Sequence, residues 1–170
     1  GKHAVRVCAQ AVTGAACQAL RVDAATSASG VTPAAATPSG LFPADLQSAY
    51  KLPSATAGAG RTVAIVDAFD DPAAESDLGV YRSQFGLPAC TTANGCFRKV
   101  GQRGTSLLPR ANASWAQETS LDLDMVSAAC PNCRILLMEA DSNSMANLGA
   151  AEDTAASMGA NVINNSYGGP

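Results

Sequence analysis

The chain has 170 residues, of which 47% are hydrophobic and 15% are charged, and its net charge at pH 7 is −3. This length suits one domain with a sizeable core, and the composition excludes an intrinsically disordered chain. Because the chain is acidic and has no basic run, we expect no nucleic-acid partner. No apolar stretch reaches the length of about 18 residues that spans a bilayer, so we expect no membrane partner either.

The first 40 residues differ in composition from the rest. Residues 1–21 form a small cysteine-bearing segment, and residues 22–40 are rich in Ala, Thr, Ser, Pro and Gly. That composition is typical of a flexible linker. The globular part is therefore expected to occupy residues 41–170.

From residue 41 onward, helical and strand patterns alternate. Helices are expected at 43–50, at 72–85 with Pro72 in the first turn, from Ser114 to about Ala129, and at 144–158. A nearly continuous apolar run predicts a buried strand at 61–67, a second buried strand is expected at 133–139, and further strands are expected at 161–166 and, shorter, near 97–100. Alternation at these spacings predicts an α/β fold, in which right-handed crossovers build a parallel sheet flanked by helices.

The six cysteines fall into three pairs that are close in sequence. A zinc site is disfavoured because the chain has one histidine and a single C-x-x-C motif. A thioredoxin-type C-x-x-C would open a helix, whereas this motif closes one. We therefore predict a secreted, extracellular protein with three local disulfides, Cys8–Cys17, Cys90–Cys96 and Cys130–Cys133.

The helix expected from Ser114 carries two acids in an unusual place. Its start is predicted by a capping box formed by Ser114 and Gln117. Its polar stripe holds Gln117, Ser120, Asp124 and Ser127, and its apolar face holds Met125, Val126 and Ala129, with Leu121 at the edge. Glu118 and Asp122 lie within the apolar face, one turn apart, where burial and mutual repulsion disfavour ionisation. We predict that they share a proton and that at least one pKa is raised, whereas Asp124 is exposed and ordinary.

Further polar residues follow the expected strands, where active sites of parallel sheets lie. They are Asp67 with Asp70 and Asp71, then the run from Glu139 to Asp141, and the run from Ser166 to Gly169. Asp70 and Asp71 are interpreted as loop and helix-cap residues. For Asp67 two interpretations stay open: a hydrogen bond to Asp122, direct or through water and with Tyr167 as a further partner, or a cap on the next turn.

Several of these motifs resemble the sedolisins, which are serine-carboxyl peptidases with a subtilisin-like fold. The shared segments are Val63–Asp67, Glu118-x-x-Leu121-Asp122-Leu123-Asp124, Ala129-x-Pro131, the segment from Asn165 to Gly168, and the run from Tyr81 to Pro88. The resemblance implies that Glu118 is the general base for a serine nucleophile and that Asp122 orients it. It also implies that Ser166, Tyr167, Gly168 and Gly169 belong to the strand that pairs with a peptide or protein substrate.

Other parts of the sedolisin pattern do not occur in this sequence. The family's serine nucleophile, its oxyanion-stabilising Asp and its calcium site all lie in segments further downstream. We therefore expect residues 41–170 to be the N-terminal half of a peptidase domain, inactive alone, whose partner is the rest of its own catalytic domain. No metal or cofactor is expected within the 170 residues. The strand containing Val162 and Ile163 should then form an exposed edge.

Two other functions remain open from the sequence. One is a secreted, non-catalytic binding module, and the other is a flavodoxin-like or receiver-like domain with Asp67, Asp70 and Asp71 as an acidic metal pocket. A Ser-His-Asp subtilisin is excluded, because His3 is the only histidine and precedes the expected linker.

Overall fold

The computed structural model describes residues 3–23 and 40–169. Most of the expected linker, residues 24–39, lies outside the described residues. The centre of the fold is a four-stranded sheet built from β4 (Thr62–Ala68), β5 (Phe97–Gly101), β6 (Arg134–Ala140) and β7 (Val162–Asn164). Its order is β5-β6-β4-β7, and every pair is parallel. The predicted α/β class with a parallel sheet is confirmed.

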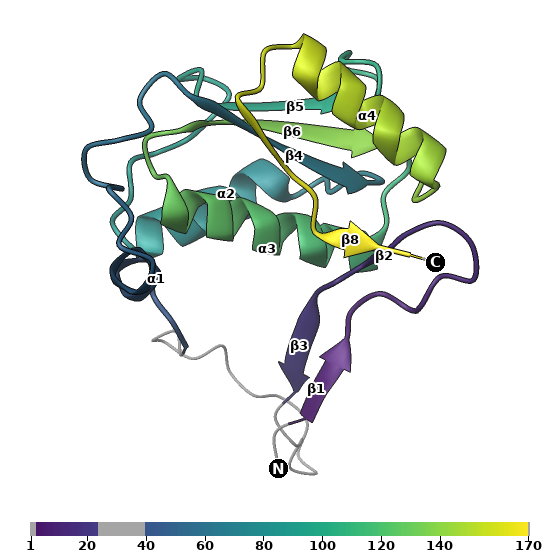
Figure 1. Ribbon diagram of the computed structural model, residues 1–170, viewed down its shortest axis with the longest axis horizontal. Coiled ribbons are helices and arrows are strands. Elements are labelled where there is room, and N and C mark those ends of the chain that lie inside the picture. Colours follow the sequence, from purple (N-terminus) through teal and green to yellow (C-terminus); the bar gives the residue numbers. More distant parts are fainter. Residues whose placement is uncertain (1–2, 24–39, 170) are drawn as a thin grey trace.

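Helices cover both faces of this sheet (Figure 1). The described helices are α1 (Pro43–Ala49), α2 (Ala74–Gln84), α3 (Ala113–Ala129) and α4 (Met145–Ser157). Successive side chains of a strand point to opposite faces, so β4 contributes to two cores. Ile65 packs in the core that contains α2 and α3 residues, whereas Val66 packs in the core that contains α4 residues.

Two helix starts differ from the prediction. Helix α2 begins at Ala74, so Pro72 lies before it. Helix α3 is capped by Asn112, whose side chain accepts hydrogen bonds from the backbone N–H groups of Ser114 (3.0 Å) and Trp115 (3.2 Å). The predicted capping box at Ser114 is therefore wrong. The backbone N–H of Asn112 donates to the carbonyl of Asp70 (3.3 Å), and this contact holds Asn112 in the extended conformation that a cap requires.

The faces of α3 are also rotated relative to the prediction. Leu121 is 41% exposed and Met125 is 37% exposed, so the expected apolar face is largely open. Ser127, expected on a polar stripe, is buried. It is buried because the side chain of Arg82 on α2 lies against it and donates from Nε to its hydroxyl (3.1 Å). Sequence periodicity cannot anticipate such a buried cation between two helices.

The N-terminal segment adds strands that the sequence patterns did not predict. Strand β1 (His3–Arg6) pairs antiparallel with β3 (Leu20–Asp23). Between them, β2 (Ala16–Cys17) pairs antiparallel with β8 (Tyr167–Gly168), close to the other end of the described chain. Figure 1 shows β2 and β8 side by side beyond the end of α3.

All three predicted disulfides, Cys8–Cys17, Cys90–Cys96 and Cys130–Cys133, are formed. The predicted edge is also present, because β7 pairs only with β4 within the described chain, and Val162 is 60% exposed. Among the described helices, none combines the length and apolar character needed to cross a bilayer.

Candidate active site

The two acids of α3 lie on one side of a cleft of about 410 Å³. The cleft is bounded by α3, by the end of β7 and by the N-terminal segment. Its lining includes Glu118, Asp122, Asn164 and Ser166. The predicted position at the carboxyl end of the parallel strands is therefore confirmed for both acids. Parallel strands place their carboxyl ends at one edge of the sheet, and α3 packs directly against β4 there.

Glu118 is buried, and its partner is a backbone group from the far N-terminal segment. Its Oε2 accepts a hydrogen bond of 2.6 Å from the backbone N–H of Ala19. Burial raises the pKa of Glu118, while hydrogen bonds from the backbone of Ala19 and Gln18 partly offset that rise. The carboxyl group is thus more basic than a solvated glutamate, and its direct partner is neutral.

Asp122 lies one turn further along α3 and is also buried. Its Oδ2 accepts a hydrogen bond of 2.9 Å from the side-chain amide of Asn164 on β7. Burial raises the pKa of Asp122 to about 7, and repulsion from Glu118 adds to the rise, while hydrogen bonds from Ser166 and Asn164 oppose it. The predicted raised pKa is present at both acids. The prediction that the two acids share a proton finds no matching hydrogen bond among the described residues. Glu118 and Asp122 each accept hydrogen bonds from other groups, and they affect one another through charge repulsion.

Asp67 lies in the buried part of β4, near its carboxyl end, and neighbours the same acids. Burial is the main cause of a pKa well above the ordinary value, and repulsion from Asp122 and Glu118 raises it further. Neither of its oxygens meets hydrogen-bond geometry with any described residue, although the Thr119 hydroxyl partly offsets the rise. Asp67 therefore caps no turn here, and it interacts with the α3 acids through charge. Burial and the neighbouring acids both disfavour the ionised form of Asp67.

Two expected roles in this region are wrong. The hydroxyl of Tyr167 donates to Oε1 of Glu152 (2.8 Å) and lies 3.0 Å from Oδ1 of Asn165, so its partners are not Asp67. Asp124 is partly buried, not exposed and ordinary. Burial raises the pKa of Asp124 to about 7, and repulsion from Asp77 contributes. Asp124 lines a neighbouring groove on the other side of α3, not the cleft.

The predicted substrate-pairing run from Ser166 to Gly169 lies along the cleft and is already paired. Gln18 donates its backbone N–H to the carbonyl of Ser166 (3.1 Å), and β8 pairs with β2 immediately beyond. Gly169 sits so close to the N-terminal segment that an added Cβ would collide with the carbonyl oxygen of Gly14. In the described chain these residues pair with the N-terminal segment, and their pairing with a substrate stays a prediction.

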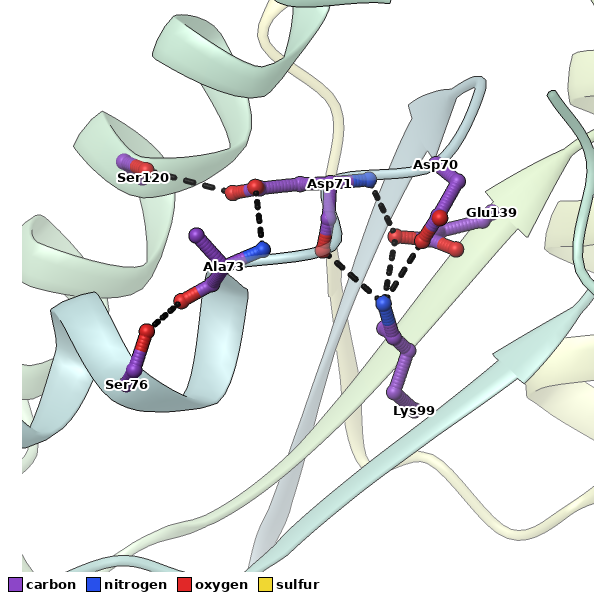
Figure 2. Close-up of polar contacts among 7 residues, drawn as sticks. All are labelled: Asp70, Asp71, Ala73, Ser76, Lys99, Ser120 and Glu139. Atoms are coloured by element: carbon purple, nitrogen blue, oxygen red, sulfur yellow. Dashed lines mark hydrogen bonds and ion pairs between the residues drawn. The ribbon is translucent and has the colours of Figure 1, made fainter. Parts of the chain in front are cut away.

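A second group of acids lies at the carboxyl ends of β4 and β6, around Lys99 on β5 (Figure 2). The ammonium group of Lys99 lies 2.6 Å from Asp70 and 3.7 Å from Glu139, and it donates to the carbonyl of Asp71 (2.8 Å). Glu139 also accepts from the backbone N–H of Asp71 (2.9 Å). The Asp71 carboxylate accepts from the backbone of Ala73 (3.0 Å) and the hydroxyl of Ser120 (3.2 Å). Asp70, Asp71, Glu139 and Lys99, called the brace group below, connect three strands to α3 and have a structural role.

The brace changes the interpretation of two sequence-predicted residues. Asp71 accepts from the backbone before α2 and so acts as the turn residue expected, whereas Asp70 is bound to Lys99 and caps nothing. The alternative of an acidic metal pocket from Asp67, Asp70 and Asp71 is not supported. Asp67 is enclosed in the core and Lys99 neutralises Asp70, and within residues 3–23 and 40–169 no cluster of acids, cysteines or histidine could hold a metal ion.

The arrangement at the cleft suits proton transfer. Glu118 is a buried carboxylate whose basicity is raised, and it touches a peptide N–H group. A general base must reach the proton that it moves, and its pKa must lie near the working pH. The charge of Asp122 affects the pKa of its neighbour Glu118, and the hydrogen bond from Asn164 holds Asp122 in place.

Comparison with known proteins bears on the fold of the chain. No protein-family model matches the sequence, and a search of curated proteins gives no match. Among solved structures, a Pseudomonas sedolisin, a serine-carboxyl proteinase complexed with two molecules of pseudo-iodotyrostatin, is similar with a TM-score of 0.57 and 22% identity. The match covers 75% of this chain and 35% of that protein. The chain therefore has an α/β fold like that of the sedolisin catalytic domain.

Proposed function

We propose that Glu118 and Asp122 are the general-base pair of a serine-carboxyl peptidase that hydrolyses peptide bonds by acyl transfer at acidic pH. The observation that carries this proposal is the contact between Oε2 of Glu118 and a peptide N–H in the cleft. Three further features support it: the raised pKa of both acids, the peptide-pairing edge at Ser166–Gly169, and the sedolisin-like fold.

In the proposed reaction, Glu118 takes the proton of a serine hydroxyl as that oxygen attacks the substrate carbonyl. It then returns the proton to the nitrogen of the leaving amine. We assign the serine and the Asp that stabilises the oxyanion to the part of the full-length protein that follows residue 170. The described residues supply the base, its positioning residue and the edge that aligns the peptide.

Asp122 gives the proposed site its acidic working range. Its pKa is about 7, so at lower pH it is neutral and does not repel the carboxylate of Glu118. Above that value Asp122 ionises, and two adjacent negative charges on α3 disturb the alignment of the base. Activity of the full-length enzyme is therefore expected to fall as the pH rises through about 7.

The test uses the full-length protein and a peptide substrate at acidic pH. Glu118→Gln preserves the size of the side chain and removes the base, so kcat should fall by a factor of about 100 to 10,000 while the fold is retained. Asp124→Asn is the matched control, because Asp124 is also a partly buried acid of α3 with a raised pKa but lies outside the cleft. It should change kcat little.

Two results would contradict the proposal. One is near-normal turnover by Glu118→Gln, and the other is an equal loss in Asp124→Asn. A full-length wild-type protein that binds peptides at this cleft but cleaves none would instead favour a non-catalytic binding module. The three disulfides support an extracellular setting for either function, since such bonds persist in oxidising compartments.

A further inference from the structure

We propose that Trp115 is a positioning residue for the general base Glu118, held in place by the rings of Phe69 and Tyr167. Phe69, Trp115 and Tyr167, called the aromatic clamp below, set the position of α3 relative to the edge formed by Ser166–Gly169. The proposal rests on the function proposed above, and it gives a role to a buried aromatic cluster that the proposed reaction does not use.

Trp115 lies in the first turn of α3 and contacts two other aromatic rings. The centroid of its ring lies 6.4 Å from that of Phe69, in an edge-to-face arrangement, and 6.1 Å from that of Tyr167. The Trp115 side chain is 4% exposed and packs in the same core as both rings. Rings at such distances attract one another in specific geometries, in addition to the effect of their burial. Trp115 therefore connects the loop after β4 with β8.

Phe69 is fixed by its main chain in an unusual conformation. Its φ is 69°, in the left-handed region that bulky residues rarely adopt. Its backbone N–H donates to the carbonyl of Ala140 at the end of β6 (2.9 Å), and the guanidinium of Arg110 lies 5.3 Å from the centroid of its ring. Strained residues of this kind persist only where their surroundings determine them, and they gather at functional sites. Here the strained conformation places the Phe69 ring against Trp115.

Tyr167 is anchored independently of Phe69, through its hydroxyl group. This hydroxyl donates to Oε1 of Glu152 on α4 (2.8 Å). The backbone of Tyr167 belongs to β8, which is part of the edge that we propose for substrate pairing. Trp115 thus has one neighbour fixed to the carboxyl end of β4 and another fixed to this edge. A residue with these two contacts can set the position of the helix relative to the substrate.

The place of Trp115 on α3 transmits this restraint to the base. Glu118 follows Trp115 by three residues, so the two side chains lie on the same side of the helix, about 4.5 Å apart along its axis. The start of α3 is tied to the same loop a second time, because the backbone N–H of Asn112 donates to the carbonyl of Asp70 (3.3 Å). A misplacement of about 1 Å can lower turnover about 100-fold, so a restraint on α3 affects the proposed reaction.

The test removes one ring of the aromatic clamp in the full-length protein. Phe69→Leu replaces the ring with an aliphatic side chain. Phe97→Leu is the matched control, because Phe97 is also buried but makes no ring contact with any described residue. Both variants should lose similar stability in urea unfolding. With a peptide substrate, kcat should fall at least tenfold in Phe69→Leu and stay within twofold in Phe97→Leu. KM should stay within twofold in both, because main-chain groups bind the peptide.

The titration of Glu118 supplies a readout that does not depend on turnover. Burial raises the pKa of this carboxyl group. A displaced α3 in Phe69→Leu should admit water to Glu118, so its pKa should fall toward the ordinary value. Carbon-13 NMR of the carboxyl group, assigned with Glu118→Gln, measures this change, which should be absent in Phe97→Leu.

The two readouts separate the aromatic clamp from the proposed function. If the wild-type protein cleaves no peptide, the peptidase assignment fails, and the Glu118 titration alone decides the positioning role: a lower pKa only in Phe69→Leu supports it, and no change overturns it. In an active enzyme, unchanged kcat in Phe69→Leu would overturn the proposal, as would an equal loss in Phe97→Leu. If Phe69→Leu does not fold, Tyr167→Phe keeps the ring and removes its anchoring hydroxyl. Its kcat should then fall at least threefold, and an unchanged kcat would overturn the proposal.

Discussion

Two groups of buried or partly buried acids lie at the same edge of the sheet and have different surroundings. The cleft group, Glu118 and Asp122, has neutral partners, namely the backbone N–H of Ala19 and the side-chain amide of Asn164. The brace group, Asp70, Asp71 and Glu139, surrounds the ammonium of Lys99 and accepts backbone N–H groups of neighbouring turns. The first group lines a cleft, whereas the second ties strands and turns together.

A raised pKa does not by itself distinguish the two groups. Burial raises the pKa of Glu139 to about 8, despite the opposing effects of the Asp71 backbone and of Lys99, and it raises the pKa of Asp122 to about 7. What differs is access and charge compensation. Glu139 is fully buried beside a cation, while Glu118 and Asp122 line the cleft and accept hydrogen bonds from neutral groups. The comparison teaches that a catalytic assignment needs an acid that lines a cleft and is not paired with a cation, as well as a perturbed pKa.

The largest expected effect on stability comes from removing the cation of the brace group. Lys99→Met leaves Asp70 and Glu139 without their partner, and loss of one member of a buried pair costs about 3 kcal/mol of unfolding free energy. Arg103→Met is the matched control, because its pair with Asp141 (2.8 Å) is largely exposed and such pairs contribute about 0–1 kcal/mol. Urea unfolding of each variant checks both values.

A double variant sharpens this prediction. Glu139→Gln removes one of the acids that Lys99 faces, so adding it to Lys99→Met should recover part of the lost stability. Strictly additive losses would show that Lys99 does not compensate Glu139, and the contrast drawn between the two groups would then fail.

The second effect is a dependence of stability on pH. The folded pKa of Asp122, about 7, exceeds the ordinary value of 3.8, so between these values the folded state binds more protons than the unfolded state. The contribution of Asp122 to the free energy of unfolding is therefore fully present below about pH 4 and is lost as the pH rises to about 7, and the contribution of Glu139 is lost by about pH 8. Asp122→Asn should flatten the part of the curve below pH 7 in urea unfolding at several pH values. An unchanged curve would contradict the perturbed pKa.

The smallest effect concerns the residue that connects the two groups. Asn112 caps α3, which carries the cleft acids, and its backbone N–H binds the carbonyl of Asp70 in the brace group. Asn112→Ala removes only the side-chain cap and should cost about 1 kcal/mol, as measured by urea or thermal unfolding. Ser114→Ala is the comparison variant, since the sequence predicted a capping role for Ser114 that the structure assigns to Asn112. A larger loss in Ser114→Ala would restore the sequence-based cap.

Local patterns in the sequence determined most of the fold. The alternation of strand and helix patterns predicted the four parallel strands, and the helices between them were expected within a few residues of their observed bounds. The cysteine spacing predicted all three disulfides, because pairs close in sequence meet at low entropic cost. The one-turn spacing of Glu118 and Asp122 placed both on the same side of α3, since that relation follows from helix geometry alone.

Only the tertiary structure decided which groups these acids meet. The partner of Glu118 lies 99 residues away in sequence, and β2 pairs with β8 across nearly the whole chain. Burial of Asp124 and of Ser127, and the lack of a hydrogen-bond partner for Asp67 among the described residues, likewise depend on elements that pack from elsewhere. Sequence periodicity indicates which side of a helix is apolar. The environment of a side chain depends on the element that packs over it. Contacts between segments that are distant in sequence produce no local sequence pattern, so the sequence alone did not predict them.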